Sequence, residues 1–179
     1  MLKKKVRWIR KVLIFAFFSC LFPVHGQELM DENLEIATFA GGCFWNIQRN
    51  FNQIDGVVST KVGYTGGHKL DPTYGEVFAG TTGHLEAVQV VYNPQRISYE
   101  ELLDAYWKMI DPTRDDGQFC DLGPQYRPVI FYHNSHQKET AKRSKQSLIQ
   151  SKQFPQVLVQ ILPGVIFYIA EDYHQNYLE

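Results

Sequence analysis

The sequence predicts an α/β (α+β) fold in which one mixed β-sheet packs against helices. Strand-like and helix-like segments alternate between residues 35 and 178, as they do where helices cover a sheet. Some neighbouring strands are separated only by short turns, which favours a mixed sheet over a purely parallel one. The roughly 150 residues that follow a predicted leader suit a single core, and no repeat or linker divides them.

Residues 1–26 have the layout of a secretory signal peptide. A basic start, "MLKKKVRWIRK", precedes the apolar run "VLIFAFFSCLF", and we place the cleavage after Gly26. The run is short of the roughly 20 residues that span a bilayer, so a retained membrane anchor is the weaker alternative. Lipidation at Cys20 is also disfavoured, because apolar residues continue past it. We therefore expect export across the inner membrane to the periplasm, and a single domain over residues 27–179.

The predicted mature protein is acidic. All six charged residues of the leader are Lys or Arg, so its removal leaves 12 basic against 19 acidic residues and a formal charge of −7. Nucleic acids and anionic membranes both call for a basic surface. Neither is therefore expected as a partner.

The first half of the domain is predicted to form three strands and one helix. Residues 35–42 resemble a short strand that ends in glycines, and residues 44–54 carry apolar side chains at the spacing of one helix face. Residues 56–67 and 84–92 are rich in β-branched residues and are bounded by turn residues, which predicts two further strands. Cys43 therefore lies at a strand-to-helix corner.

The second half begins with a well-defined helix. Ser98 and Glu101 form a capping box, and apolar residues at helical spacing follow until an Asp-Pro pair ends the helix. Residues 127–133 then predict a strand and residues 135–152 a polar helix. Residues 156–178 predict a closing pair of strands and a last turn of helix.

Two cysteines remain after the leader, Cys43 and Cys120. A structural disulfide is the simplest alternative to a chemical role in an oxidising compartment. Gly41 and Gly42 allow a tight turn before Cys43, and the first turn of a helix stabilises a thiolate, so we expect a lowered pKa for this cysteine. A small buried core cysteine between packed aromatic residues is the other alternative.

Three further polar side chains are expected to approach Cys43. Glu86 stands at the start of an otherwise apolar strand, which suggests a carboxylate at the sheet edge near the glycine corner. Burial there would raise its pKa and make it a proton donor, whereas a solvated strand end would not. Tyr74 and Tyr126 flank loops and can direct hydroxyl groups to the same point, unless they are half-buried core residues.

Eight short stretches occur in the order and approximate spacing of a known family. They are "GGCFW", "VGYTGG", "PTYGEV", "TGHLEAVQVVY", "ISYEELL", "DPT", "GPQYR" and "AEDYHQNYL". With these motifs, residues 36–178 resemble the A-type peptide methionine sulfoxide reductases. The resemblance implies an α/β two-layer sandwich with a ferredoxin-like core.

The resemblance also implies a role for each residue of the site. Cys43 attacks the sulfur of a methionine sulfoxide, and Glu86 protonates the departing oxygen. Tyr74 and Tyr126 hydrogen-bond the oxygen, and Asp121 orients the substrate. Phe44 and Trp45 enclose the S-methyl group of the substrate. His84 and His174 support the site.

The implied reaction is the thiol-dependent reduction of methionine S-sulfoxide, free or within proteins, to methionine, which repairs oxidative damage. It leaves a sulfenic acid on Cys43 that a second thiol can reverse. We expect no cofactor, an external reductant such as a thioredoxin-like protein, and a monomer. A metal site is not expected, because the histidines have no ligand spacing.

The resemblance frames a hypothesis about Cys120. Many members of the family continue into a tail with one or two resolving cysteines, whereas this sequence ends at Glu179, so we expect a domain without that tail. Cys120 is then the other mature thiol, and we expect it to resolve the sulfenic acid by forming a disulfide with Cys43. The alternative is a packed thiol, with the reductant acting on Cys43 directly.

Two other classes of protein fit parts of the sequence. A cysteine-dependent acyl hydrolase needs a base beside Cys43 and an orienting carboxylate, and His84 and Asp121 are the candidates for these roles. An exported binding protein needs only an aromatic pocket for a small apolar ligand, with Cys43 inert. The reductase accounts for more of the sequence than either.

Overall fold

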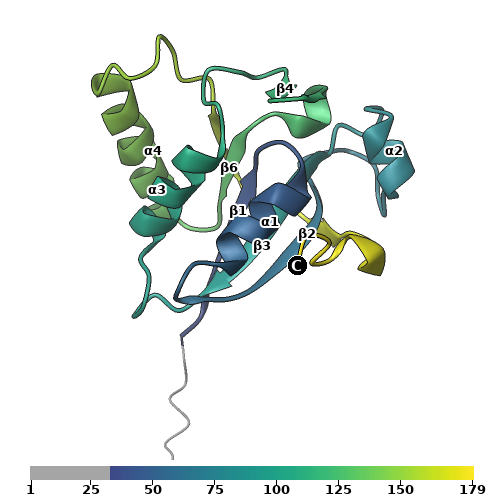
Figure 1. The fold of residues 1–179 in the computed structure, drawn as a ribbon, viewed down its shortest axis with the longest axis horizontal. Helices are drawn as coiled ribbons and strands as arrows, with labels where there is room; N and C mark the ends of the chain where they lie inside the picture. Colours follow the sequence, from purple (N-terminus) through teal and green to yellow (C-terminus); the bar gives the residue numbers. More distant parts are fainter. Residues whose placement is uncertain (1–32) are drawn as a thin grey trace, which may run out of the picture. The chain divides into compact units, whose positions relative to one another are not determined.

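A six-stranded mixed sheet forms the centre of the structure, a computed structural model that describes residues 33–179. Its strands are β1 (Glu35–Ala40), β2 (Val57–Thr65), β3 (Leu85–Tyr92), β6 (Val129–Tyr132), β7 (Gln160–Pro163) and β8 (Phe167–Ile169). Their order is β7-β6-β1-β3-β2-β8 (Figure 1). All neighbours are antiparallel except β6 and β7. The predicted signal segment 1–26, including Cys20, lies outside the described residues.

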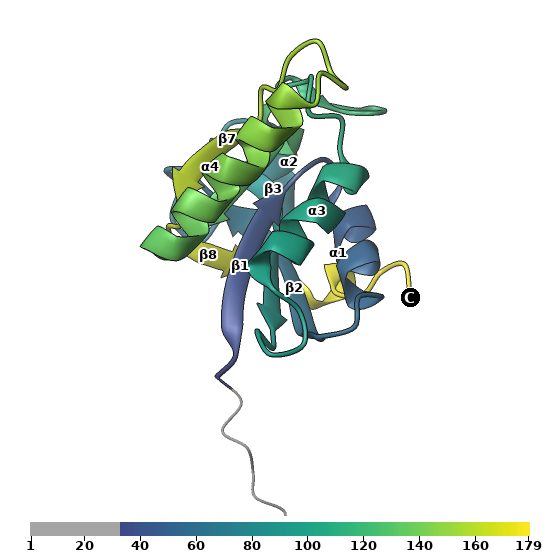
Figure 2. The same cartoon turned by 90° about the vertical axis from the view of Figure 1, so that its left-hand side faces the viewer.

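Three helices form the second layer on one face of the sheet (Figure 2). They are α1 (Phe44–Asn52), α3 (Tyr99–Met109) and α4 (Ser135–Gln150). Phe39 of β1 is central to this interface, because it stacks on Phe51 and Tyr106 with ring-centroid distances of 5.1 and 5.0 Å. The opposite face has a smaller buried cluster that includes Phe131. Within residues 33–179, no helix has the length and apolar character needed to cross a membrane.

The four inner strands and two of the helices confirm the predicted ferredoxin-like core. The chain runs β1-α1-β2-β3-α3-β6, and the inner strands lie in the order β6-β1-β3-β2. Strands β7 and β8 extend this sheet at opposite edges, so the closing strands do not pair with each other as the sequence suggested. Strand β8 packs on β2 where Gly63 has no side chain: a Cβ at Gly63 would lie 2.6 Å from the Phe167 ring.

Several short elements were not predicted. They are the helix α2 (Tyr74–Phe78), the hairpin of β4 (Gly117–Gln118) and β5 (Asp121–Leu122), and the 3₁₀ turn η1 (Pro124–Tyr126). The predicted last turn of helix is present as the 3₁₀ turn η2 (Asp172–His174). Helix α2 is only five residues long, and Glu76 accepts a hydrogen bond from the N–H of its N-cap residue Thr73.

Candidate active site

Cys43 lies at the predicted strand-to-helix corner. Strand β1 ends at Ala40, and Cys43 is the N-cap residue of α1. Gly42 has a φ of +84°, which side chains rarely adopt, and a Cβ at Gly41 would lie 2.6 Å from Ile110 Cγ2. The Tyr106 hydroxyl donates a hydrogen bond of 2.7 Å to the Ala40 carbonyl and so fixes the end of β1. The two glycines are therefore needed for this turn.

The carboxylate of Glu86 lies beside this corner. Its Oε2 accepts a hydrogen bond of 3.1 Å from the N–H of Phe44, the residue directly after Cys43. The side chain is 2% exposed. Strand β3 is an inner strand whose Ala87 pairs with Ala40, so Glu86 is near the beginning of a central strand and not on the sheet edge that the sequence suggested. The end of β1 and the start of β3 thus bring the two residues together.

Burial gives Glu86 the properties of an acid that is active near neutral pH. Burial raises its pKa to about 7, the Phe44 N–H acts in the opposite direction, and the charge of Asp121 raises it further. A group with this pKa is partly protonated at pH 7. The solvated-carboxylate alternative therefore does not describe Glu86.

The expected lowering of the Cys43 pKa is wrong. Burial raises the pKa of the thiol to about 11, and the charges of Glu86 and Asp121 raise it as well. The backbone N–H groups of Trp45 and Asn46 act in the lowering direction, as the sequence suggested, but they are outweighed. Without substrate, Cys43 is therefore a thiol at neutral pH. It becomes a thiolate only when its proton is transferred to another group.

Tyr74 and Tyr126 are close enough to this pair for its charges to act on them. Burial raises the pKa of Tyr126 to about 12, and the charge of Glu86 adds to this. Burial and the same carboxylate also raise the pKa of Tyr74. The Tyr126 carbonyl accepts a hydrogen bond of 2.9 Å from the Gly42 N–H, which ties η1 to the corner. Both hydroxyls are thus protonated and able to donate.

An aromatic cluster adjoins the corner on the helix side. Phe44 is fully buried, whereas Trp45 is half-buried and stacks on Tyr177 with a centroid distance of 4.0 Å. The His174 ring lies 5.3 Å from the Phe44 ring and 4.4 Å from the Tyr74 ring. It is 2% exposed, and neither of its nitrogens has a hydrogen-bond partner. Burial lowers the pKa of His174, so the ring is neutral.

Glu171 is a residue of this region that the sequence reasoning missed. Its Oε1 accepts from the Tyr74 N–H at 2.9 Å, and its Oε2 accepts from the Tyr64 hydroxyl at 2.8 Å. Burial acts in the opposite direction, but these hydrogen bonds lower the pKa of Glu171, so it is ionised. It therefore fixes the first residue of α2. The sequence signal that could have identified Glu171 is its place in the "AEDYHQNYL" motif, three residues before His174.

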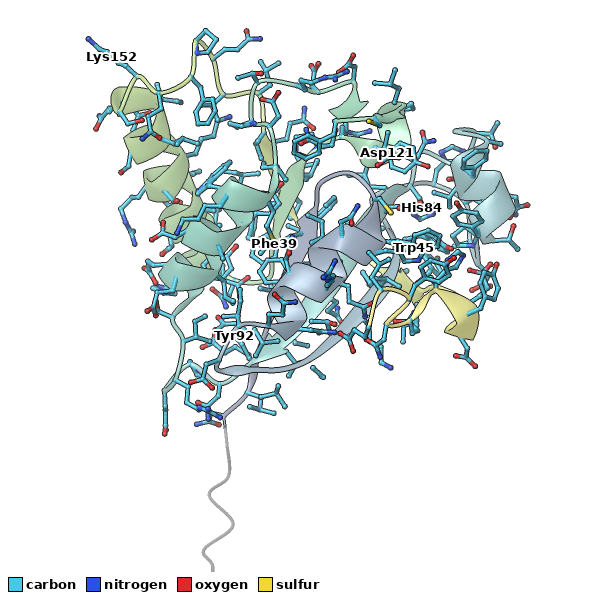
Figure 3. The ribbon with its side chains drawn as sticks, in the orientation of Figure 1. Phe39, Trp45, His84, Tyr92, Asp121 and Lys152 are labelled. Atoms are coloured by element: carbon cyan, nitrogen blue, oxygen red, sulfur yellow. The ribbon has the colours of Figure 1, made fainter. Side chains whose placement is uncertain are left out.

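A cavity of about 410 Å³ opens between the start of α1 and the β4–β5 hairpin. Both Cys43 and Cys120 line it, and both are free thiols, so the structural disulfide is absent from the described residues. Asp121 is also part of the lining. The full lining is Gly41, Gly42, Cys43, Asn46, Ile47, Asn50, Met109, Phe119, Cys120 and Asp121. Figure 3 shows Asp121 and Trp45 at the same end of the domain.

His84 has no free nitrogen with which to act as a base. The Gly67 N–H donates to its Nδ1 at 3.1 Å, and its Nε2 lies 2.8 Å from the Lys69 carbonyl, to which it donates. This leaves the acyl hydrolase hypothesis without its proposed base. His84 instead ties the loop before α2 to the start of β3. Among residues 33–179, no three His, Cys, Asp or Glu side chains gather in a way that could hold a metal ion.

Comparison with known proteins identifies similar sequences and structures. The family model for peptide methionine sulfoxide reductase matches residues 35–179. The peptide methionine sulfoxide reductase MsrA of Methanosarcina mazei is 54% identical over 149 residues, which cover 83% of this chain and 71% of that protein. Methionine sulfoxide reductase A of Corynebacterium diphtheriae has a TM-score of 0.74 at 33% identity, covering 81% of this chain and 74% of that chain. Mxr1 of Saccharomyces cerevisiae, solved in complex with Trx2, has a TM-score of 0.57 at 25% identity, covering 80% of this chain and 84% of that chain.

Proposed function

The chain belongs to the peptide methionine sulfoxide reductase family, and we propose that the residues around Cys43 carry out the reaction of that family. The enzyme is an oxidoreductase that reduces methionine sulfoxide to methionine at the expense of thiols, and it repairs oxidised proteins. The hydrogen bond of 3.1 Å from the Phe44 N–H to Glu86 Oε2 is the observation that best supports the assignment. It holds a carboxyl group of near-neutral pKa directly beside the nucleophile.

In the proposed reaction, Cys43 is the nucleophile and Glu86 the general acid. The Cys43 sulfur bonds to the sulfoxide sulfur as a proton moves from Glu86 to the sulfoxide oxygen. The bond between that oxygen and the substrate sulfur then breaks, the oxygen bonds to the Cys43 sulfur, and the sulfur–sulfur bond breaks to release the thioether, while the Cys43 proton replaces the one that Glu86 gave. The oxygen ends on Cys43 as a sulfenic acid, so one sulfoxide and one thiol give one thioether and one sulfenic acid. The Tyr74 and Tyr126 hydroxyls donate hydrogen bonds to the oxygen as it gains charge.

The arrangement supports a preference for one epimer of the sulfoxide. The sulfur of methionine sulfoxide is chiral, because it carries an oxygen, a methyl group and the side chain. We assign the methyl group to the aromatic cluster of Phe44 and Trp45, and the oxygen to Glu86. In the other epimer these two groups exchange places, which would bring the oxygen against the aromatic rings, away from the acid that protonates it, and the methyl group against the buried Glu86 carboxyl. The S epimer is the one that the family resemblance implies.

The direct test offers purified protein and dithiothreitol the two separate sulfoxide epimers of a blocked methionine. We expect consumption of the S epimer alone, and no consumption by a Cys43→Ser variant. Equal consumption of the two epimers would contradict the assignment of the methyl and oxygen sites. Full activity of Cys43→Ser would contradict the whole mechanism.

We further propose that a dithiol protein of the thioredoxin type returns the electrons and that the enzyme is a monomer. The complex of the similar protein Mxr1 with Trx2 supports the first part of this proposal. Turnover with thioredoxin, thioredoxin reductase and NADPH tests it, and the mass from light scattering tests the second part. Failure of thioredoxin to replace dithiothreitol would argue for another donor.

We also propose that residues 1–26 direct export and are removed after Gly26. The basic and apolar segments of the leader support this proposal. The expected result is a protein in the periplasmic fraction whose mass begins at Gln27. An intact N-terminus in a membrane fraction would instead support a retained anchor.

A further inference from the structure

The β4–β5 hairpin has a fixed base and an exposed tip. Gln118 is fully buried, and its side-chain amide both accepts from the Asp111 N–H at 2.7 Å and donates to the Asp111 carbonyl at 2.9 Å. Gln118 also packs on the glycine corner, since a Cβ at Gly42 would lie 2.8 Å from Gln118 Cβ. The base of the hairpin is therefore held against the residue that precedes Cys43.

The two-residue turn of this hairpin is Phe119–Cys120. Phe119 has a φ of +50°, an uncommon value for a residue with a side chain, and its side chain is 66% exposed. The ladder of the hairpin has two residue pairs, the Gly123 N–H donates to the Asp116 carbonyl at 2.9 Å next to them, and Arg114 Nη1 donates to the Phe119 carbonyl at 3.4 Å. A ribbon with so few pairs is easily rearranged. A change in the turn can therefore move Cys120 while Gln118 stays fixed.

The cavity beside Cys43 connects the two thiols and includes Asp121, but it does not include the three residues assigned to the sulfoxide oxygen. Cys43 and Cys120 both line it, whereas Glu86, Tyr74 and Tyr126 do not. Cys120 can therefore approach the Cys43 sulfur by a side on which the groups assigned to the sulfoxide oxygen do not lie. A disulfide requires the two Cα atoms to lie within about 7 Å, so the proposal below requires the turn to bring Cys120 to this distance from Cys43.

We propose that Cys120 is both the resolving thiol and the sulfur on which the external dithiol acts, with the hairpin tip as the docking surface for that dithiol protein. This inference rests on the proposed function, which supplies the sulfenic acid. The Cys120 sulfur bonds to the Cys43 sulfur, the bond from Cys43 to oxygen breaks, and the oxygen leaves as water with the sulfenic acid proton and the Cys120 thiol proton. One thiol and one sulfenic acid thus give one disulfide and one water.

The external dithiol then reduces the disulfide in two exchanges. Its first thiolate bonds to the Cys120 sulfur and releases Cys43. Its second thiolate attacks the mixed disulfide and releases Cys120, so the dithiol leaves as a disulfide and the enzyme regains two thiols.

Access selects Cys120 as the sulfur that is attacked, because Cys120 is exposed and Cys43 is half-buried. The apolar side chains beside it, Phe119 and Leu122, are 66% and 63% exposed. This exposed apolar pair gives a protein partner a contact surface around the reactive sulfur.

Thiol counting tests the resolving role. In a full chain that carries Cys20→Ser, one turnover of the S-sulfoxide should consume two thiols per methionine formed. The same chain with Cys120→Ser should form methionine at the same rate, lose one thiol, and react with the sulfenic acid probe dimedone. Loss of only one thiol per methionine by the chain that keeps Cys120, or unchanged thioredoxin-driven turnover of the Cys120→Ser chain, would overturn the proposal. If neither chain forms methionine, the proposed function itself fails.

Trapping and a surface variant test the docking role. A thioredoxin whose second active-site cysteine is replaced by serine should form a mixed disulfide that peptide mass spectrometry assigns to Cys120, and an assignment to Cys43 would overturn the proposal. Leu122→Ser should raise the KM for thioredoxin at least threefold and leave the dithiothreitol-driven rate unchanged. The control Ile149→Ser, on the last turn of α4 and also exposed, should change neither. Equal KM values for the two variants would contradict the docking surface.

Discussion

The pKa values of Cys43 and Glu86, about 11 and about 7, determine which protonation form of the pair reacts. The pair holds two protons below pH 7, one between pH 7 and 11, and none above pH 11. Attack by a thiolate with help from an acid needs a single proton, on Glu86. That form is a constant minor share of the enzyme between pH 7 and 11, and its share falls as the pH drops below 7.

A Glu86→Gln variant tests this account of the proton. We expect kcat/KM of the wild type for the sulfoxide to rise up to about pH 7 and then stay level to pH 9.5. The variant has no acid, so it should be about 10²- to 10³-fold slower at pH 8, and its rate should keep rising with pH as Cys43 ionises. Stopped-flow measurement of methionine formation with subsaturating substrate gives both profiles. A wild-type rate that declines between pH 7 and 9 would contradict this account. It would show that the reactive form carries both protons, with Cys43 still a thiol.

The same carboxyl group makes stability depend on pH. The pKa of Glu86 is raised from 4.5 to about 7 in the folded protein, so the native state holds the proton more tightly than the unfolded chain does. Its contribution is therefore fully present below pH 4.5 and is lost as the pH rises to 7, by about 3 kcal/mol in total.

Glu86→Gln lacks this titration, which gives a second prediction. The free energy of unfolding of the variant, relative to the wild type, should increase by up to about 3 kcal/mol between pH 5 and 8. Urea unfolding of both proteins across that range measures the difference. A difference that is constant with pH would contradict the raised pKa.

Glu171 positions Tyr74 by accepting its backbone N–H, and a Glu171→Ala variant tests that role. The variant leaves the first turn of α2 without this partner, so we expect kcat for methionine formation to fall about tenfold while KM changes little. Cys43 should react with iodoacetamide at the wild-type rate, because its surroundings are unaltered. Equal losses in kcat and in the folded fraction would instead indicate a purely structural role.

Much of the residue-level site was predictable from the sequence. A glutamate in an apolar strand and a cysteine after two glycines stand out locally, and the structure brings them together. The pKa of Cys43 was not predictable, because local geometry gives only the lowering effect of the helix N–H groups. The raising effects come from burial by distant residues and from the charges of Glu86 and Asp121, which are 43 and 78 positions away in the sequence.

At the scale of elements, the turn between β1 and α1 sets the position of the nucleophile, and Gly42→Ala tests this. The substitution places a Cβ 2.8 Å from Gln118 Cβ at a φ of +84°, which should cost about 1–3 kcal/mol of stability and displace Cys43. Ser98→Ala is the matched control, because it removes the N-cap hydrogen bond of α3 and should cost about 1 kcal/mol. Urea unfolding and single-turnover assays should show that both variants are destabilised but that Gly42→Ala alone is slow. Equal activity of the two would mean that the turn does not position the thiol.

The elements that the sequence predicted are those long enough to show the periodic pattern of apolar residues that marks a helix or a strand. Helix α3 has a capping box and a full apolar face, and strands β1 to β3 have β-branched runs. The β4–β5 hairpin has two residues in each strand, so no period can appear. Strand β8 adopts its edge position because Gly63 admits Phe167, a contact between residues 104 positions apart that no local pattern records.

At the scale of the whole molecule, the Cys43 sulfur lies between two regions with different partners. Glu86, on β3, lies beside it within the fold, whereas the cavity leads to Cys120 on the hairpin. Of these two residues, Glu86 and not Cys120 should therefore control sulfoxide reduction, and Cys120 and not Glu86 should control recycling. In the steady state the slower of the two half-reactions limits turnover.

Combining the two variants in a chain with Cys20→Ser tests this separation. Cys120→Ser alone should lower thioredoxin-driven turnover at least tenfold. In the Glu86→Gln background it should lower turnover by less than twofold, because sulfoxide reduction is already the slow step. Single-turnover methionine formation should be the same with and without Cys120→Ser in both backgrounds. If Cys120→Ser slows that first step, the hairpin acts on the sulfoxide site itself, and the two sides of Cys43 are not independent.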